Sequence, residues 1–227
     1  MRQYQVDDLN SQREKGQRAE HVAAWYLRLN GFLSIPAFVV HLDSINPRSN
    51  REGEPIIQRT EADLIAVRFP YSRETIANRH MTDDPRLVKN ESEGKKKPLF
   101  ILAEVKAGKC SMNGPWTNPR EKNMQRVLHR MGFTDKDDII DQAATSLYNT
   151  GRWEGRNIIV QYVCFGEYTD PELQATYEMV CQITWEEIGK FLHSRHKESP
   201  LKNPHNPHEH WSSGVIADGP NSRFDFQ

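Results

Sequence analysis

An apolar run that ends in an acid and an amine constrains this chain more than any other feature. Residues 99–103 are typical of a buried strand, and Glu104 and Lys106 follow them directly. Because the side-chain period of a strand is two, both charged groups are expected on the same side of it. Buried strands do not normally carry such a pair, so the pattern favours a metal-assisted hydrolytic site.

The composition bounds the class of protein. The 227 residues suffice for one large domain or two small ones with a substantial core. Contents of 37% apolar and 27% charged residues are typical of a soluble globular protein. The net charge of −1 does not indicate a polyanionic partner, so any nucleic-acid surface is expected to be a local basic patch.

Signals for targeting and cofactors are few. No apolar run approaches the ~20 residues of a membrane span, and the polar amino end predicts no secretory signal. Cys110, Cys164 and Cys181 follow no zinc spacing, so reduced thiols and a cytoplasmic location are expected. The chain has no Walker motif and no dinucleotide glycine pattern, so no nucleotide cofactor is expected.

The order of the expected elements predicts one α/β domain over residues 1–196, with a central mixed sheet flanked by helices. The elements are a helix over 16–30, strands over 32–42, 62–69 and 99–106, helices opened at Asn118 and Thr134, strands over 157–165 and 177–183, and a last helix opened by a capping box of Thr184 and Glu187.

Three polar segments are expected outside these elements. Residues 43–59 are interpreted as a loop, and residues 70–97 as a solvated insertion between paired strands. Residues 197–227 are rich in proline, histidine, serine and glycine, which predicts an irregular carboxyl-terminal tail.

Two further acids stand where they can join Glu104 and Lys106. Asp63 opens a core strand, so it can converge with Glu104 on one cation if the two strands are neighbours. Glu20 lies at the edge of the apolar stripe of the first helix, from which it can lean toward the sheet and orient a water or a metal ligand. Lys106 would then activate that water or stabilise charge on a phosphate.

Each of these residues also has an ordinary structural interpretation. Glu104 and Lys106 can form a simple ion pair at a strand end, Asp63 can be a turn residue, and Glu20 can be a surface acid of its helix. The acid-x-Lys pattern also occurs at Glu93 and Lys95 within a charge run. The pattern becomes specific for a hydrolytic site only when all its members occur in order: an acid on a helix, an acid on a strand, and an acid and a lysine two residues apart on the next strand.

In this order the residues resemble the PD-(D/E)XK nuclease superfamily, which includes restriction endonucleases, Holliday-junction resolvases and phage or repair exonucleases. The resemblance covers roughly residues 16–165 and rests on Glu20, Asp63, Glu104 and Lys106, with Ala62 where the family motif has proline. It implies a restriction-endonuclease-like α-β-β-β-α-β core. It also implies that Asp63 and Glu104 bind Mg²⁺, or Mn²⁺ in its place, while Lys106 assists the attack on a phosphodiester bond.

The candidate nucleic-acid contacts are basic residues around the third strand and the following helix. They are Lys109, Arg120, Lys122, Arg126 and Arg130, of which the last three are spaced to line one helical face. A solvated helix face explains the same row about as well. Trp116 follows a Gly-Pro pair and is interpreted as a core plug rather than a base-stacking residue.

These observations leave three functions open. The first is a Mg²⁺-dependent deoxyribonuclease with DNA as its partner and a homodimer as one arrangement for cutting two strands. The second is an inactive protein with the same fold that binds nucleic acid or assembles a complex. The third is an interaction subunit whose carboxyl-terminal tail recruits a partner.

Overall fold

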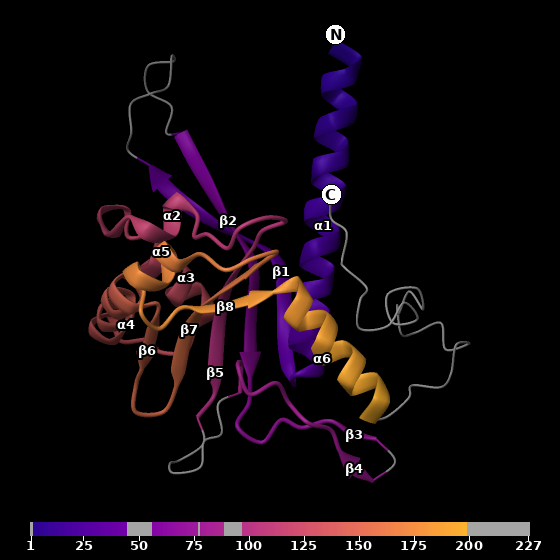
Figure 1. Ribbon diagram of the computed structural model, residues 1–227. Helices are drawn as coiled ribbons and strands as arrows, with labels where there is room; N and C mark the ends of the chain where they lie inside the picture. Colours follow the sequence, from indigo (N-terminus) through magenta and orange to yellow (C-terminus); the bar gives the residue numbers. More distant parts are fainter. Residues whose placement is uncertain (1, 45–55, 77, 89–96, 199–227) are drawn as a thin grey trace.

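The computed structural model describes residues 2–44, 56–76, 78–88 and 97–198, which build a central sheet with helices on both faces (Figure 1). The strands of this sheet are β1 (Phe32–Ser44), β2 (Ile56–Arg68), β5 (Leu99–Val105), β6 (Arg152–Glu154), β7 (Ile159–Gly166) and β8 (Cys181–Thr184). Their order is β1-β2-β5-β7-β6, and β8 pairs with the end of β7 beyond β6.

The pairing of these strands makes the sheet mixed, as the sequence predicts. β1, β2 and β5 are antiparallel neighbours, whereas β5 and β7 run parallel in the centre. A parallel pair needs a crossover, and the helical segment between β5 and β7 supplies it. All residues of β7 are buried, which fits its central place and its run of apolar side chains.

The helices form two layers that bury opposite faces of the sheet. They are α1 (Arg2–Leu29), α2 (Gly114–Thr117), the 3₁₀ turn η1 (Pro119–Glu121), α3 (Asn123–Met131), α4 (Asp137–Thr150), α5 (Pro171–Thr176) and α6 (Trp185–Glu198). α1 and α6 cover one face, on the right of Figure 1, and α3 and α4 cover the other. No helix among the described residues has the length and apolarity to cross a membrane.

Several helix boundaries agree with the sequence signals. α1 ends before Gly31, which adopts a φ of 78° that suits glycine, although the helix begins well before the predicted residue 16. Thr184 and Glu187 form the predicted capping box: Glu187 Oε2 accepts from Thr184 N at 2.8 Å, and Thr184 Oγ1 accepts from Glu187 N at 3.3 Å. α6 runs to Glu198, so the prediction of an irregular tail is wrong for residues 197 and 198, and residues 199–227 lie outside the described residues.

The helix predicted from Asn118 is broken. Asn118 does act as a cap, because its side chain accepts from Arg120 N, but it caps only the 3₁₀ turn η1. Lys122 then takes a left-handed φ of 54°, and α3 starts after it. The short elements β6 and α5 were also not predicted, since each is too brief to show a periodic pattern.

Two polar segments are more structured than their composition suggests. β2 begins at Ile56, inside the predicted loop 43–59, because it pairs with β1 as far as Ser44. Within the insertion 70–97, the hairpin of β3 (Thr75–Ile76) and β4 (Arg79–His80) is followed by a stretch in which Met81, Asp84 and Leu87 are buried. The prediction of a solvated segment is therefore wrong for residues 81–88, while residues 89–96 lie outside the described part.

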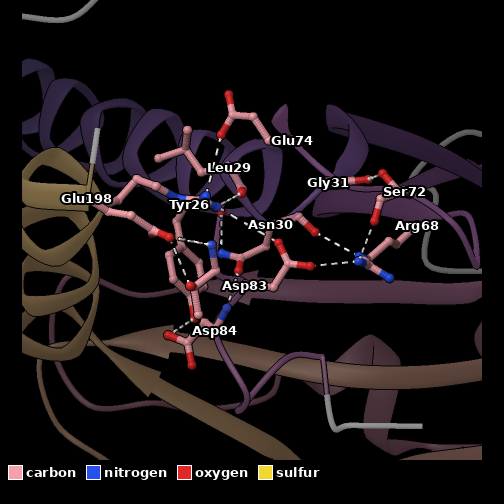
Figure 2. Close-up of polar contacts among 12 residues, drawn as sticks. Tyr26, Leu29, Asn30, Gly31, Arg68, Ser72, Glu74, Asp83, Asp84 and Glu198 are labelled. Atoms are coloured by element: carbon pink, nitrogen blue, oxygen red, sulfur yellow. Dashed lines mark hydrogen bonds and ion pairs between the residues drawn. The ribbon is translucent and has the colours of Figure 1, made fainter. Parts of the chain in front are cut away.

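A buried polar network holds this insertion against α1 (Figure 2). Tyr26 donates its hydroxyl hydrogen bond to Asp84 at 2.7 Å, and Asn30 Oδ1 accepts from Asp84 N at 2.6 Å. Arg68, near the end of β2, pairs with Asp83 at 2.7 Å and donates to the Asn30 carbonyl at 2.9 Å. These hydrogen bonds add to apolar packing, because Leu87 lies in the same core cluster as Ala23 and Tyr26 of α1.

The last turns of α6 join the same network. The Arg195 side chain is 4% exposed, donates to the Leu29 carbonyl and lies 3.7 Å from Glu74 and 3.9 Å from Asp83. Glu198 accepts from the backbone and the hydroxyl of Thr82. Arg195 thus links the end of α1, the insertion and α6.

Candidate active site

The ladder between β2 and β5 stops immediately before the two strand acids. Its last pair is Leu64 with Ala103, so Asp63 and Glu104 follow where the strands begin to separate. Asp63 Oδ2 accepts a hydrogen bond from Val105 N at 2.7 Å and so takes the place of a backbone acceptor. The carboxylate is therefore fixed at the point where the sheet opens.

The outer neighbour of Asp63 is irregular as well. In the register of β1 and β2 the residue facing Asp63 is Ala37, which has a φ of 50° and forms no ladder pair. Ala62 also packs in the same core cluster as Ile65, although a regular alternation would send the two to opposite faces. Asp63 thus lies where the regular pleat of two strands is interrupted.

Glu104 is a completely buried carboxylate with two donors. Its exposed fraction is 0%, Trp116 Nε1 donates to Oε1 at 2.7 Å, and Lys106 Nζ donates to Oε2 at 2.6 Å. The core plug predicted for Trp116 is confirmed, because this side chain is 0% exposed within the cluster that packs under α3 and α4. The indole also hydrogen-bonds the candidate site, which the sequence did not indicate.

Lys106 brings the acids together through one ammonium group. In addition to Glu104, its Nζ lies 3.7 Å from Asp63 Oδ2 and donates to Asn113 Oδ1 at 3.0 Å. Glu104 and Lys106 therefore share one side of β5, as the strand period predicts, and Asp63 reaches the same ammonium from β2. The two carboxylates already face a common positive charge.

The electrostatics of this group follow from its burial. Burial raises the pKa of Glu104 to about 7, and the Asp63 charge adds to the effect, while Lys106 and Trp116 oppose it. Burial by itself would lower the pKa of Lys106, but the carboxylates of Glu104 and Asp63 prevail and raise it above its ordinary value. Lys106 is accordingly an ammonium at neutral pH, and Glu104 holds its proton unusually well.

Glu20 joins the group from the helix layer. It is half-buried on α1, and burial, followed by the charges of Asp63 and Glu61, raises the pKa of Glu20. The Lys106 ammonium acts in the opposite direction. Asp63 and Glu104 each pair with Lys106, whereas Glu20 is linked to Asp63 and Lys106 only through these charge effects and forms no hydrogen bond or ion pair with them among the described residues.

The predicted nucleic-acid contacts are distributed over two places. Lys109 pairs with Asp170 at 3.1 Å, beside the isolated bridge that joins Lys109 to Tyr168. Arg120 and Lys122 are exposed at η1, Arg126 is half-exposed on α3, and Arg130 lies 5.5 Å over the Phe38 ring. Within the described residues Arg120, Lys122 and Arg126 form no ion pair with an acid.

Two further neighbours of the site carried no sequence signal. Asn113 contacts Lys106 from a turn, and nothing in its local pattern sets it apart from other asparagines. The Tyr162 hydroxyl is buried without a hydrogen-bond partner among the described residues. Burial, with Glu104 as the next cause, raises the pKa of Tyr162 well above its ordinary value.

The donor set fits a hard divalent cation that a substrate helps to bind. Within the described residues no three His, Cys, Asp or Glu side chains are grouped to enclose a metal ion. Mg²⁺, however, is commonly held by one or two carboxylates together with water and substrate phosphate. Asp63 and Glu104 supply such a pair, and their shared contact with the Lys106 ammonium indicates that they stabilise positive charge.

Comparisons of the chain with family models, with curated proteins and with solved structures find no match.

Proposed function

We propose that this protein is a Mg²⁺-dependent nuclease that hydrolyses DNA phosphodiester bonds at the site formed by Asp63, Glu104 and Lys106. The observation that carries the proposal is the convergence of the two carboxylates on one ammonium, where β2 and β5 separate. The order α1, β1, β2, β5, crossover helices and β7 also agrees with the α-β-β-β-α-β core implied by the resemblance to PD-(D/E)XK nucleases.

In this proposal each residue has a distinct role. Asp63 and Glu104 would hold the cation, which when bound would supply positive charge to the scissile phosphate and lower the pKa of a water. The Lys106 ammonium donates to a phosphate oxygen as negative charge develops there. Glu20 orients the water from the helix side.

The net reaction is hydrolysis with no redox change. The water oxygen forms a bond to phosphorus, the bond from phosphorus to the leaving sugar oxygen breaks, and the proton lost by water is balanced by the one gained at the leaving oxygen. The exposed residues Arg120 and Lys122 and the half-exposed Arg126 would contact phosphates away from the site, which predicts salt-sensitive binding.

Cleavage of a panel of duplex, single-stranded and branched DNAs with Mg²⁺ or Mn²⁺ tests this function. Asp63→Asn, Glu104→Gln and Lys106→Met are each expected to lower the rate by about a hundredfold or more while the chain still folds. Asp138→Asn, which alters an exposed acid in the first turn of α4, is the matched control and should cleave normally. Folded protein that leaves every DNA intact with either metal would refute the proposal.

A further inference from the structure

One turn contacts both charged groups at the end of β5. Asn113 Oδ1 accepts a hydrogen bond from Lys106 Nζ at 3.0 Å, and Trp116 Nε1 donates to Glu104 Oε1 at 2.7 Å. Pro115 stands between them, and Trp116 N donates to the Asn113 carbonyl at 3.0 Å, which closes the turn. The relative position of the acid and the amine is therefore coupled to the shape of this turn.

The side chain of Asn113 does not cap the helix that it precedes. Asn113 is the N-cap of α2, where an asparagine side chain ordinarily accepts from the backbone of the first turn. It makes no such capping hydrogen bond here. Asn118, the next N-cap in the chain, does cap its turn by accepting from Arg120 N at 3.1 Å. The Asn113 amide is instead committed to Lys106.

Lys106 and a divalent cation would compete for the same oxygens. The ammonium now contacts Glu104 at 2.6 Å and lies 3.7 Å from Asp63. A cation held by both carboxylates would repel it and take their negative charge. Asn113 Oδ1 is neutral and is already a partner, so among the three oxygens around the ammonium it is the acceptor that a cation would leave available.

We propose that Asn113 is the positioning residue that retains Lys106 when a divalent cation displaces its ammonium from Asp63 and Glu104. This inference rests on the proposed function and adds the residue that fixes the amine beside the phosphate. Asn113 itself contacts neither the reacting atoms nor the cation. Its effect on cation binding must therefore pass through Lys106.

A double-mutant cycle on Mn²⁺ affinity, measured by calorimetry without DNA, tests this dependence. Asn113→Ala is expected to weaken Mn²⁺ binding about tenfold, because the amine then has only the carboxylates as acceptors. In a Lys106→Met background the same substitution should change the affinity less than about twofold. An equal loss in both backgrounds would mean that Asn113 acts on the fold of the site alone, and would overturn the inference.

Asn118→Ala is the matched control, since it removes a capping asparagine from the same segment without a contact to the site. It should reduce thermal stability but leave Mn²⁺ affinity unchanged. Single-turnover cleavage at saturating Mn²⁺ gives a second readout, and Asn113→Ala is expected to slow it about tenfold. Unchanged affinity and rate in Asn113→Ala would refute the inference alone, whereas absence of Mn²⁺ binding and cleavage in the unaltered protein would also refute the proposed function.

Discussion

Burial of the Glu104 carboxyl group in the candidate site has a cost in folding stability. Glu104 is fully buried, and its pKa of about 7 lies above the ordinary value of 4.5. A carboxylate of this kind destabilises the fold once it ionises, unless a cation or an ammonium offsets its charge. Its hydrogen bonds from Trp116 and Lys106 provide part of this compensation.

The burial of Glu104 predicts a pH-dependent stability. Because its folded pKa exceeds the unfolded value, its favourable contribution is complete below about pH 4.5 and is lost as the pH rises through about 7. In chelator, Glu104→Gln should therefore gain stability relative to the unaltered protein between pH 5 and pH 8, by up to about 3 kcal/mol. Urea unfolding at both values measures this, and an identical pH dependence for the two proteins would contradict it.

Tyr162 allows a second prediction for a single side chain. Its buried hydroxyl has no hydrogen-bond partner among the described residues, so it bears a desolvation penalty without compensation. Tyr162→Phe keeps the ring and should raise the free energy of unfolding by about 1 kcal/mol. Tyr26→Phe, which removes a hydroxyl bonded to Asp84, is the matched control and should lower it. Destabilisation by Tyr162→Phe would show that the hydroxyl has a partner.

Prediction from sequence succeeded at this scale where chemistry follows from spacing. The strand period placed Glu104 and Lys106 on one side, and the structure joins them to Asp63. Asn113 was missed because its contact depends on a turn that no local pattern specifies. The left-handed φ of Ala37 was missed for a related reason, since alanine carries no signal for that conformation.

At the scale of elements, strong periodic signals were reliable and tertiary context decided the rest. The capping box of α6 is present as predicted, and the helix predicted from Thr134 exists as α4, although it begins at Asp137 after Lys136 rather than at Thr134. The insertion was assigned to solvent from its polar composition, but hydrogen bonds to Tyr26, Asn30 and Arg68 hold residues 81–88 in place. Polar networks of this kind are built by distant partners, so composition alone cannot reveal them.

The attachment of α6 to the insertion can be tested through Arg195. Arg195→Met would leave the half-buried Asp83 and Glu74 with one cation fewer and should lower the free energy of unfolding by about 3 kcal/mol. Lys190→Met breaks an exposed pair with Glu186 on the same helix and should change stability by less than about 0.5 kcal/mol. Chemical denaturation compares the two, and equal small effects would show that Arg195 does not link these elements.

In the whole molecule, the Arg195 network and the candidate site lie at different places along β2. The Arg195 network joins α1, the insertion and α6 around Arg68, near the end of β2, whereas Asp63 lies earlier in the same strand and faces β5 where the ladder stops. The α/β class and mixed sheet followed from the order of elements. The pairing of both β6 and β8 with different parts of β7 did not, because short strands at a sheet edge carry little periodic pattern.

The central claim is that Asp63 and Glu104 hold one divalent cation together. Calorimetric titration of Mn²⁺ into the unaltered protein, Asp63→Asn and Glu104→Gln tests it most directly, with Asp138→Asn as the control for a lost surface charge. We expect a single Mn²⁺ site that both site variants lose and that the control keeps. Mn²⁺ binding that persists in Asp63→Asn and Glu104→Gln, or that is absent from the folded unaltered protein, would contradict it.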